Sequence, residues 1–298
     1  MRSVVPILTV LAGILALWYL GAVLLNADWA RAQAERQDRV LTTNELIVET
    51  WRQDRPRLPA PHQVAVELWN TTLAPCIEGR RAGQVACVTN NRSLFYHGWV
   101  TLAVTLAGFA FGAALGVVLA TGIVYSRAMD LSVMPWVIAS QTIPILAIAP
   151  MIIVVLNSVG MQGFVPKAII ATYLSFFPVT VGMVKGLRAP TAMQLDQMKT
   201  WNATGLTQFL RLRLPSSMPY LFTSLKVAVA ASLVGTIVGE LPTGAVAGLG
   251  ARLLAGSYYG QTVQIWSALF GAAALAAVLI LAVGFVERLV TSRMGFGR

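Results

Sequence analysis

The chain has 298 residues, of which 56% are hydrophobic and 11% are charged, and its formal net charge is +10. Soluble domains average about 25% charged residues, so an ordinary soluble enzyme is excluded and a polytopic membrane protein is indicated. The basic residues lie between apolar segments, which argues against nucleic-acid binding. The chain has only two cysteines and two histidines, and we expect no metal.

Six apolar segments follow one another along the chain, each near the roughly 20 residues that a membrane span needs. We therefore expect an all-α protein with about six transmembrane helices. The first segment exceeds the roughly 7–15 apolar residues of a signal peptide, which favours an uncleaved anchor. The predicted spans are 4–25, 100–125, 131–156, 164–184, 220–238 and 265–286.

Lysine and arginine residues predict the orientation of these spans. With the N-terminus inside, ten basic residues lie in cytoplasmic segments and two, Lys167 and Arg252, lie in short outer loops, which is the positive-inside pattern. We expect a multi-pass protein of the bacterial inner (plasma) membrane with both termini cytoplasmic. The ten are Arg2, Arg127, Lys185, Arg188, Lys199, Arg211, Arg213, Arg288, Arg293 and Arg298.

This orientation divides the chain into an anchor (1–25), a periplasmic segment (26–97) and a core of five transmembrane helices (98–298). Within the periplasmic segment, the pattern of 28–57 predicts a surface helix or a helix pair. Prolines at 56, 59 and 61 end it, and 62–69 resumes an amphipathic pattern that suits the membrane surface.

A second polar segment, 185–219, is predicted to be cytoplasmic and carries apolar residues at helical spacing. A solvated loop does not require this pattern, so we interpret the segment as two short helices that dock a cytoplasmic partner. Asn202 suits a left-handed turn between them, and Gly205 is the alternative bend. The apolar residues are Leu195, Met198, Trp201, Leu206, Phe209 and Leu210.

This segment resembles the permease subunits of type I ABC importers of the nitrate/sulfonate/taurine class. Their cytoplasmic signature is EAA, three residues, Gly, eleven residues, then LP. Counted back from Leu214 and Pro215, the first position is Asp196 and the glycine position is Asn202. Further matches to the class lie at 58–64 (LPAPHQV), 101–120, 142–150, 175–179 and 239–250.

The resemblance implies the type I ABC importer permease fold and a transport subunit rather than an enzyme. It implies as partners a cytoplasmic ABC ATPase dimer, a second permease subunit in a homodimer, a periplasmic solute-binding protein and the lipid bilayer. The sequence has no G-x-x-x-x-G-K-[ST] phosphate loop, so ATP is expected on the partner and no cofactor on this chain. The class imports nitrate, sulfonates, taurine, cyanate, and pyrimidine and flavin precursors.

By the same resemblance, the helix after the glycine position fits a groove of the ATPase. The residues assigned to ATPase coupling are Asp196, Asn202, Ala203, Thr204, Gly205, Leu206, Phe209, Leu210, Leu214 and Pro215.

Polar and aromatic residues inside the apolar segments are candidates for the translocation pathway, because buried polar groups in membrane spans are costly and often functional. Serine and threonine also bond to their own helix backbone, aromatic rings pack against neighbours, and Glu240 equally suits a solvated interface. The candidates are Gln141, Thr142, Asn157, Tyr173, Ser175, Phe176, Phe177 and Glu240.

Gly108, Gly112 and Gly116 form two overlapping G-x-x-x-G steps, which let helices approach closely. The helix that they contact lies either in the same subunit or in a second permease.

Two other functions compete with the permease. A polytopic membrane enzyme needs clustered acids or histidines, but residues 98–298 contain no histidine and four scattered acids. A secondary transporter does not need the docking helices, and co-purification with an ATPase subunit would distinguish it from the permease.

The two cysteines, Cys76 and Cys87, both lie in the segment predicted to be periplasmic, where disulfides persist. Ten residues separate them, and closing such a loop stabilises a fold by about 3 kcal/mol in the chain-entropy model. We predict a Cys76–Cys87 disulfide, with two unpaired thiols as the alternative.

Intact-mass analysis of the protein after thiol alkylation tests this disulfide. It is expected to show no added alkyl group without reductant and two with it. Two alkyl groups on the unreduced protein would contradict the bond.

Overall fold

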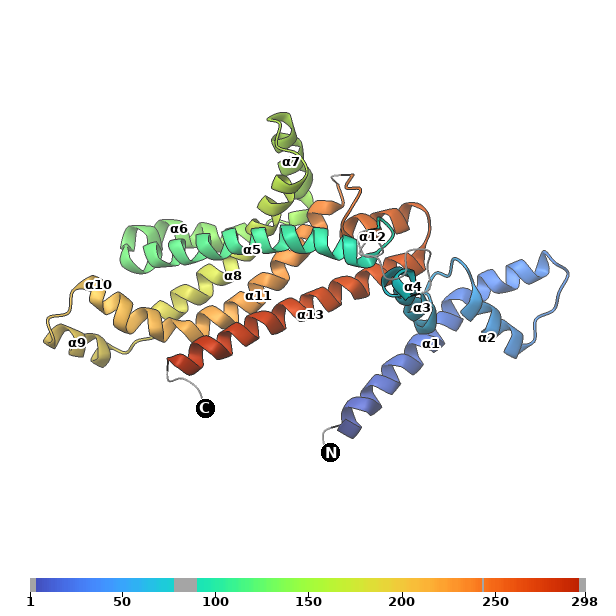
Figure 1. Ribbon diagram of the computed structural model, residues 1–298, viewed down its shortest axis with the longest axis horizontal. Coiled ribbons are helices and arrows are strands. Elements are labelled where there is room, and N and C mark those ends of the chain that lie inside the picture. Colours follow the sequence, from blue (N-terminus) through green and yellow to red (C-terminus); the bar gives the residue numbers. More distant parts are fainter. Residues whose placement is uncertain (1–3, 78–89, 243, 295–298) are drawn as a thin grey trace. The chain divides into compact units, whose positions relative to one another are not determined.

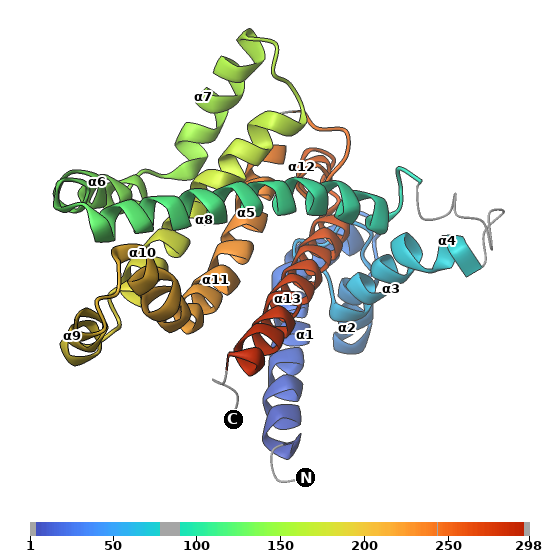
Figure 2. The ribbon, with the colours of Figure 1, turned by 60° about the vertical axis from the view of Figure 1, so that its left-hand side comes forward.

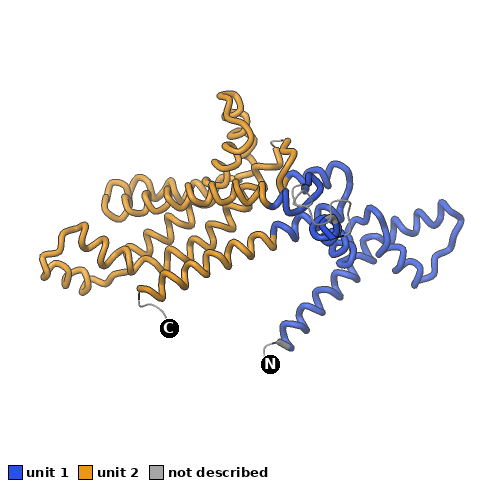
Figure 3. The backbone as a smooth tube through the Cα atoms, viewed as in Figure 1, with its two compact units in different colours: residues 1–98, 251–272 blue, residues 99–250, 273–298 orange. Residues whose placement is uncertain are grey.

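The computed structural model describes residues 4–77, 90–242 and 244–294, and these form helices and no strand. The chain makes two compact units, coloured separately in Figure 3. Unit 1 comprises Met1–Gly98 and Ala251–Ala272, and unit 2 comprises Trp99–Gly250 and Ala273–Arg298. The division predicted from the sequence also has a boundary near residue 98, but it assigns 251–272 to the core rather than to the N-terminal part.

Within the described residues, five helices are long and apolar enough to cross a membrane, and a bent pair brings the number to as many as six. Each of the five helices contains one of the predicted spans, and most of the helices extend past the predicted span into polar residues. The five are α1 (Val4–Glu35), α5 (Leu94–Tyr125), α8 (Phe164–Leu187), α11 (Leu214–Glu240) and α13 (Thr262–Arg293).

The predicted span 131–156 is not one straight helix. Its residues form α6 (Arg127–Ser140) and α7 (Ile145–Ser158), which meet at 100°. Pro144 precedes α7 in an extended conformation, and proline disfavours a helical conformation at the residue before it. The predicted span is therefore broken inside its apolar run, and the bent pair counts as the sixth span if it crosses the membrane as one unit. Ala149 and Ile153 of α7 pack against Ile170 of α8, while Figures 1 and 2 show one end of α7 extending beyond the other helices of unit 2.

Small residues allow α5 to lie directly against α8 in unit 2. Cβ atoms built on Gly108 and Gly112 would overlap Ala171 and Ser175, and one on Gly116 would lie 2.8 Å from Val179 Cβ. These G-x-x-x-G steps therefore serve packing inside the subunit, which was one of the two alternatives.

Helix α8 packs on α11 in the same way, and Ala171 lies close to glycines of both α5 and α11. A Cβ on Gly182 would lie 2.5 Å from Ser224 Cβ, and one on Gly235 would lie 2.9 Å from the Ala171 Cα. Buried hydroxyls join α11 to α5: Ser232 Oγ donates to the Thr105 carbonyl at 2.8 Å. Because lipid offers no hydrophobic drive for helix association, close packing and such hydrogen bonds hold the three helices together.

An ion pair attaches α13 to this core. Lys226 of α11 contacts Glu287 of α13, and both side chains are half-buried. Each charge thus has a partner, as charges within apolar helices require.

For residues 28–57 the sequence allowed a surface helix or a helix pair. In unit 1, α1 runs on to Glu35, and α2 (Thr43–Arg52) follows after a capping box at Thr42. Then come α3 (Pro61–Thr72) and α4 (Ala74–Ile77), and most of α12 (Leu249–Tyr258) also belongs to unit 1. Cys76 lies in α4 and Cys87 is outside the described residues, so their disulfide stays a prediction.

Buried polar contacts hold unit 1 together. Asn26 of α1 accepts a hydrogen bond from Arg57 N–H at 2.7 Å and donates to the Leu58 carbonyl at 2.8 Å, which fixes the proline-rich turn. Arg252 of α12 lies 3.9 Å from Glu67 of α3. Burial raises the pKa of Glu67 and lowers the pKa of Arg252, and their mutual attraction partly offsets both shifts.

The contact between α5 and α8 predicts the effect of one added methyl group. In Gly112→Ala, the new Cβ meets Ser175 and lies 3.1 Å from the backbone nitrogen of Phe176, so the two helices must separate. Overpacking of this kind costs about 1–3 kcal/mol. We expect a lower midpoint of thermal unfolding in detergent. Gly98→Ala, on the same helix with no atom within 4 Å of its Cβ, is the matched control and should unfold like the wild type.

Candidate functional site

The polar segment predicted to dock a partner lies where α8 ends and α11 begins (Figures 1 and 2). It contains α9 (Ala192–Thr200), the single turn α10 (Gly205–Gln208) and the π-helical segment η2 (Phe209–Arg213). A capping box starts α9: Thr191 N–H donates to Gln194 Oε1 at 2.9 Å, and Gln194 N–H donates to Thr191 Oγ1 at 3.4 Å.

The turn between α9 and α10 is at Asn202, as predicted, and not at Gly205. Asn202 has φ +53°, which is the left-handed region. Its N–H donates to the Lys199 carbonyl at 2.9 Å, and Ala203 N–H donates to the Met198 carbonyl at 3.0 Å. These two bonds make a Schellman motif, in which the left-handed residue follows the helix end. Asparagine thus fulfils the conformational role of the signature's glycine.

The second predicted short helix is not a separate element. Residues from Gly205 onward continue through η2 into α11 and form a helical stretch that reaches Glu240. Thr204 caps its start by accepting a hydrogen bond from Thr207 N–H at 3.3 Å. In η2, Leu214 N–H donates to the Phe209 carbonyl five residues back. This wide turn rotates the first turns relative to the rest of the helix.

The apolar residues of the segment divide into two groups. Leu206 and Leu210 are 68% and 51% exposed, and Trp201 and Met193 of the α9 region are 67% and 79% exposed. Phe209 instead packs inward against a core cluster made of Ala120, Ile123, Met183, Val184 and Leu187, as does Leu214. Pro215 is the second residue of α11, directly after the wide turn of η2 in the same helical stretch.

Asp196, the acidic position of the signature, is at the surface. It pairs with Lys199 three residues on at 2.8 Å, and both side chains are largely exposed. Because the side chain is exposed, Asp196 is accessible to a partner. Since surface ion pairs contribute little stability, the pair with Lys199 can be exchanged for a contact with that partner.

Several of the predicted pathway residues come together at the bend between α6 and α7. Gln141 and Thr142 are exposed in the bend itself. The Tyr173 hydroxyl of α8 donates to the Ser140 carbonyl, and the Tyr173 and Phe176 rings lie 6.1 Å apart.

The remaining pathway candidates lie apart from the bend. Phe177 is half-buried on α8, Asn157 is exposed near the end of α7, and Ser175 donates to the Gly108 carbonyl at 3.1 Å as a packing contact.

Glu240 lies away from that group and is fully buried, so the solvated interface considered for it is excluded. Thr101 Oγ1 donates to its carboxylate at 2.9 Å, and Gly250 N–H donates to it at 2.7 Å. Thr101 Oγ1 in turn accepts a hydrogen bond from Leu249 N–H at 2.9 Å. Glu240 therefore binds the first backbone N–H groups of α12, where a negative charge is favourable.

The glycines after Glu240 fit this arrangement. Gly248 has φ +129°, and a Cβ there would overlap the Glu240 carboxylate. In the sequence, the only sign of this contact was the family match at 239–250, which contains both Glu240 and Gly248. Hydropathy alone did not show that these two residues meet.

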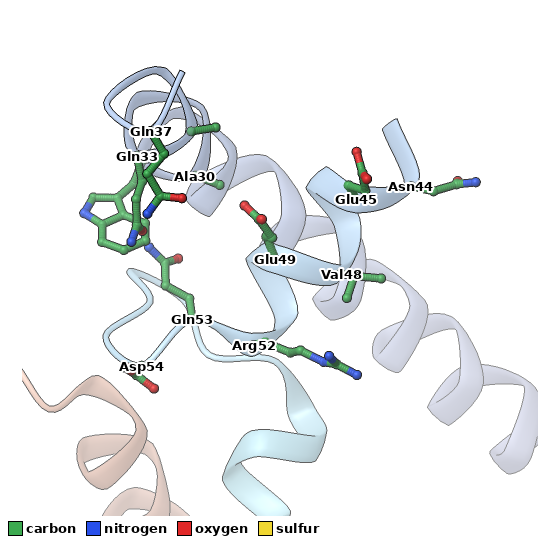
Figure 4. A pocket seen from close by; sticks show the side chains of 12 residues that line it. Ala30, Gln33, Gln37, Asn44, Glu45, Val48, Glu49, Arg52, Gln53 and Asp54 are labelled. Carbon is green, nitrogen blue, oxygen red and sulfur yellow. The ribbon is translucent and has the colours of Figure 1, made fainter. Parts of the chain in front are cut away.

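A groove in unit 1, shown in Figure 4, was not singled out from the sequence. It has a volume of about 630 Å³ and lies between the end of α1 and α2. Two of its acids are engaged locally: Glu45 in the α2 capping box, and Glu49 with Arg39 at 3.6 Å. The lining residues are Trp29, Ala30, Gln33, Ala34, Gln37, Asn44, Glu45, Val48, Glu49, Arg52, Gln53 and Asp54.

Sequence comparison finds relatives among bacterial permeases. The chain is 32% identical over 162 residues to a probable ABC transporter permease protein of Haemophilus influenzae, covering 54% of this chain and 64% of the relative. It is 34% identical over 161 residues to the formylaminopyrimidine transport permease protein ThiX of Halalkalibacterium halodurans, covering 54% of this chain and 62% of the relative. The chain thus spans less than two thirds of the length of each.

The fold is similar to that of a solved transporter subunit. A chain of the inward-facing MetNI methionine ABC transporter aligns with a TM-score of 0.59 and 19% identity, over 66% of this chain and 96% of that one. The family model described as binding-protein-dependent transport system inner membrane component matches residues 112–296, which is more than half of the sequence. The chain therefore belongs to the family of binding-protein-dependent transport system inner membrane components.

Proposed function

We propose that this chain is the membrane-spanning permease subunit of an ATP-binding-cassette importer for a small solute. One observation carries the proposal: a short helix with exposed leucines is the direct continuation of a membrane-length helix, α11. Any force applied to that short helix acts on the span itself. A transporter driven by a separate ATPase needs this connection, and a secondary transporter or a membrane enzyme does not.

The exposed apolar side chains support a protein partner on this segment. Leu206, Leu210, Trp201 and Met193 lie within a polar, charged stretch, and apolar side chains rimmed by polar ones mark interaction sites. A short helix with leucines four residues apart suits a hydrophobic groove on the partner. The partner is a cytoplasmic ABC ATPase dimer, which binds the ATP, so this chain needs no cofactor.

A second copy of the permease completes the pathway in this proposal. Helix α7 projects from unit 2 and exposes Leu146, Met151, Val154 and Val155. In a homodimer these side chains meet the partner copy, and the bend that carries Gln141, Thr142, Tyr173 and Phe176 borders the shared pathway. A periplasmic solute-binding protein delivers the solute to the side that carries residues 26–97.

The solute belongs to the nitrate, sulfonate, taurine or pyrimidine and flavin precursor class. The relative named as a formylaminopyrimidine permease, at 34% identity, makes pyrimidine precursors the first class to test. The positive-inside pattern supports the inner membrane, with both termini cytoplasmic.

The docking assignment predicts the effect of charges on the exposed leucines. In Leu206→Asp combined with Leu210→Asp, the carboxylates must be desolvated in the ATPase groove, and removing such anchors typically costs about 2 kcal/mol or more of binding energy. We expect co-purification with the ATPase and transport to be lost while the permease still inserts. Val246→Asp, an exposed apolar position in the loop after α11, is the control and should bind the ATPase normally. Normal assembly and transport by the double variant would contradict the assignment.

The orientation predicts the pattern of cysteine labelling. With Cys76 and Cys87 replaced by serine, a cysteine at the exposed position Lys199 should react with a membrane-impermeant maleimide only after the cells are opened. A cysteine at the exposed position Asn44 should react in cells whose inner membrane is intact. Labelling of position 199 from the periplasm would refute the orientation.

A further inference from the structure

Three helix ends meet at Arg213, the last residue of η2. Its Nη1 donates to the carbonyl of Leu187, the last residue of α8, at 2.9 Å. Its guanidinium carbon lies 5.7 Å from the ring centre of Tyr125, the last residue of α5. One side chain directly before α11 therefore contacts the ends of α5 and α8, the two helices that form the closely packed core with α11.

The same tyrosine ring holds a second side chain of η2. The Phe209 ring lies 6.0 Å from the Tyr125 ring at 68°, which is the favourable edge-to-face geometry. The first and last residues of the π-helical segment, Phe209 and Arg213, therefore both contact Tyr125. In contrast, Leu206 and Leu210 point outward from the same helical stretch.

We propose that Arg213 and Tyr125 form a positioning link between the docking helix, which we define as α10 and η2 together, and the ends of α5 and α8, so that these parts move as one body. This inference rests on the proposed function, and it identifies the residues that couple a movement of the ATPase to the membrane helices. The exposed leucines contact the ATPase, and the inward Phe209 and Arg213 connect the docking helix to α5 and α8. Neither Arg213 nor Tyr125 is needed to hold the ATPase itself.

The chemistry of arginine explains why this residue suits the position. Its planar guanidinium stacks on an aromatic face and donates an in-plane hydrogen bond to a carbonyl at the same time. A lysine ammonium offers a point charge and cannot satisfy both contacts in the same geometry. The carbonyl it reaches is one of those left without a partner at the end of α8, where a cation is favourable.

The test is made on the permease reconstituted in vesicles with its ATPase and its solute-binding protein. Arg213→Met and Tyr125→Leu remove the link and leave the exposed leucines in place. We expect both variants to co-purify with the ATPase and to hydrolyse ATP, but to consume at least fivefold more ATP per solute imported. Tyr125→Phe keeps the ring that both contacts use and should match the wild type, while Arg213→Lys should resemble Arg213→Met.

A distance measurement separates the link from a general loss of stability. Spin labels are placed at the exposed positions Ala128 and Arg211, in a chain with Cys76 and Cys87 replaced by serine. Ala128 lies in the first turn of α6, three residues after the end of α5, so the pair reports the separation of this corner from the docking helix. With the link intact, the distance distribution should be narrow and unchanged by ATP. In Arg213→Met and in Arg213→Lys, it should broaden or shift when ATP binds.

The outcomes distinguish this inference from the proposed function. If Arg213→Met and Tyr125→Leu keep the normal ratio of ATP to solute and a narrow distance distribution, the link is wrong, whereas the docking of Leu206 and Leu210 is unaffected. If the charged leucine variant assembles and transports normally, the docking proposal itself fails.

Discussion

The close approach of α5, α8 and α11 is the constraint on which the rest of unit 2 depends. Glycines and serines bring the helix backbones together, and a single added Cβ on Gly112 would force them apart. Since lipid gives no hydrophobic drive for association, this contact and its few hydrogen bonds set where each helix lies. The short helix that we propose docks the ATPase is the extension of α11, so the same packing sets its position relative to α5 and α8.

A second fixed point lies at the other end of α11. Glu240 is buried and binds backbone N–H groups at the start of α12, directly through Gly250 and through Thr101 to Leu249. A buried carboxyl group is costly unless it is hydrogen-bonded, so these bonds hold the start of α12 to the end of α11. The loop after α11 is therefore restrained at both of its ends.

The spans and the turn at Asn202 could be predicted because each has a local cause. Hydropathy marks a span wherever apolar residues run long enough, and asparagine is among the few residues that tolerate a left-handed conformation. The break between α6 and α7 could not be predicted in this way, because hydropathy does not record helix direction. Proline was a poor guide as well: Pro150 and Pro178 lie inside intact helices, while Pro144 begins one. The inward direction of Phe209 was also missed, because it depends on the wide turn of η2, which has no periodic signature in the sequence.

Asn202 has a consequence for how the docking signature is recognised. Its side chain is exposed, so the position that the signature gives to glycine does not need to be small, but only needs to adopt a positive φ. A sequence pattern that demands glycine between the two helices passes over chains of this kind. A pattern that demands glycine, asparagine or aspartate, followed by leucines four residues apart and then by LP, would retrieve them. Permeases with diverged signatures can thus be found by the backbone geometry that their residues permit.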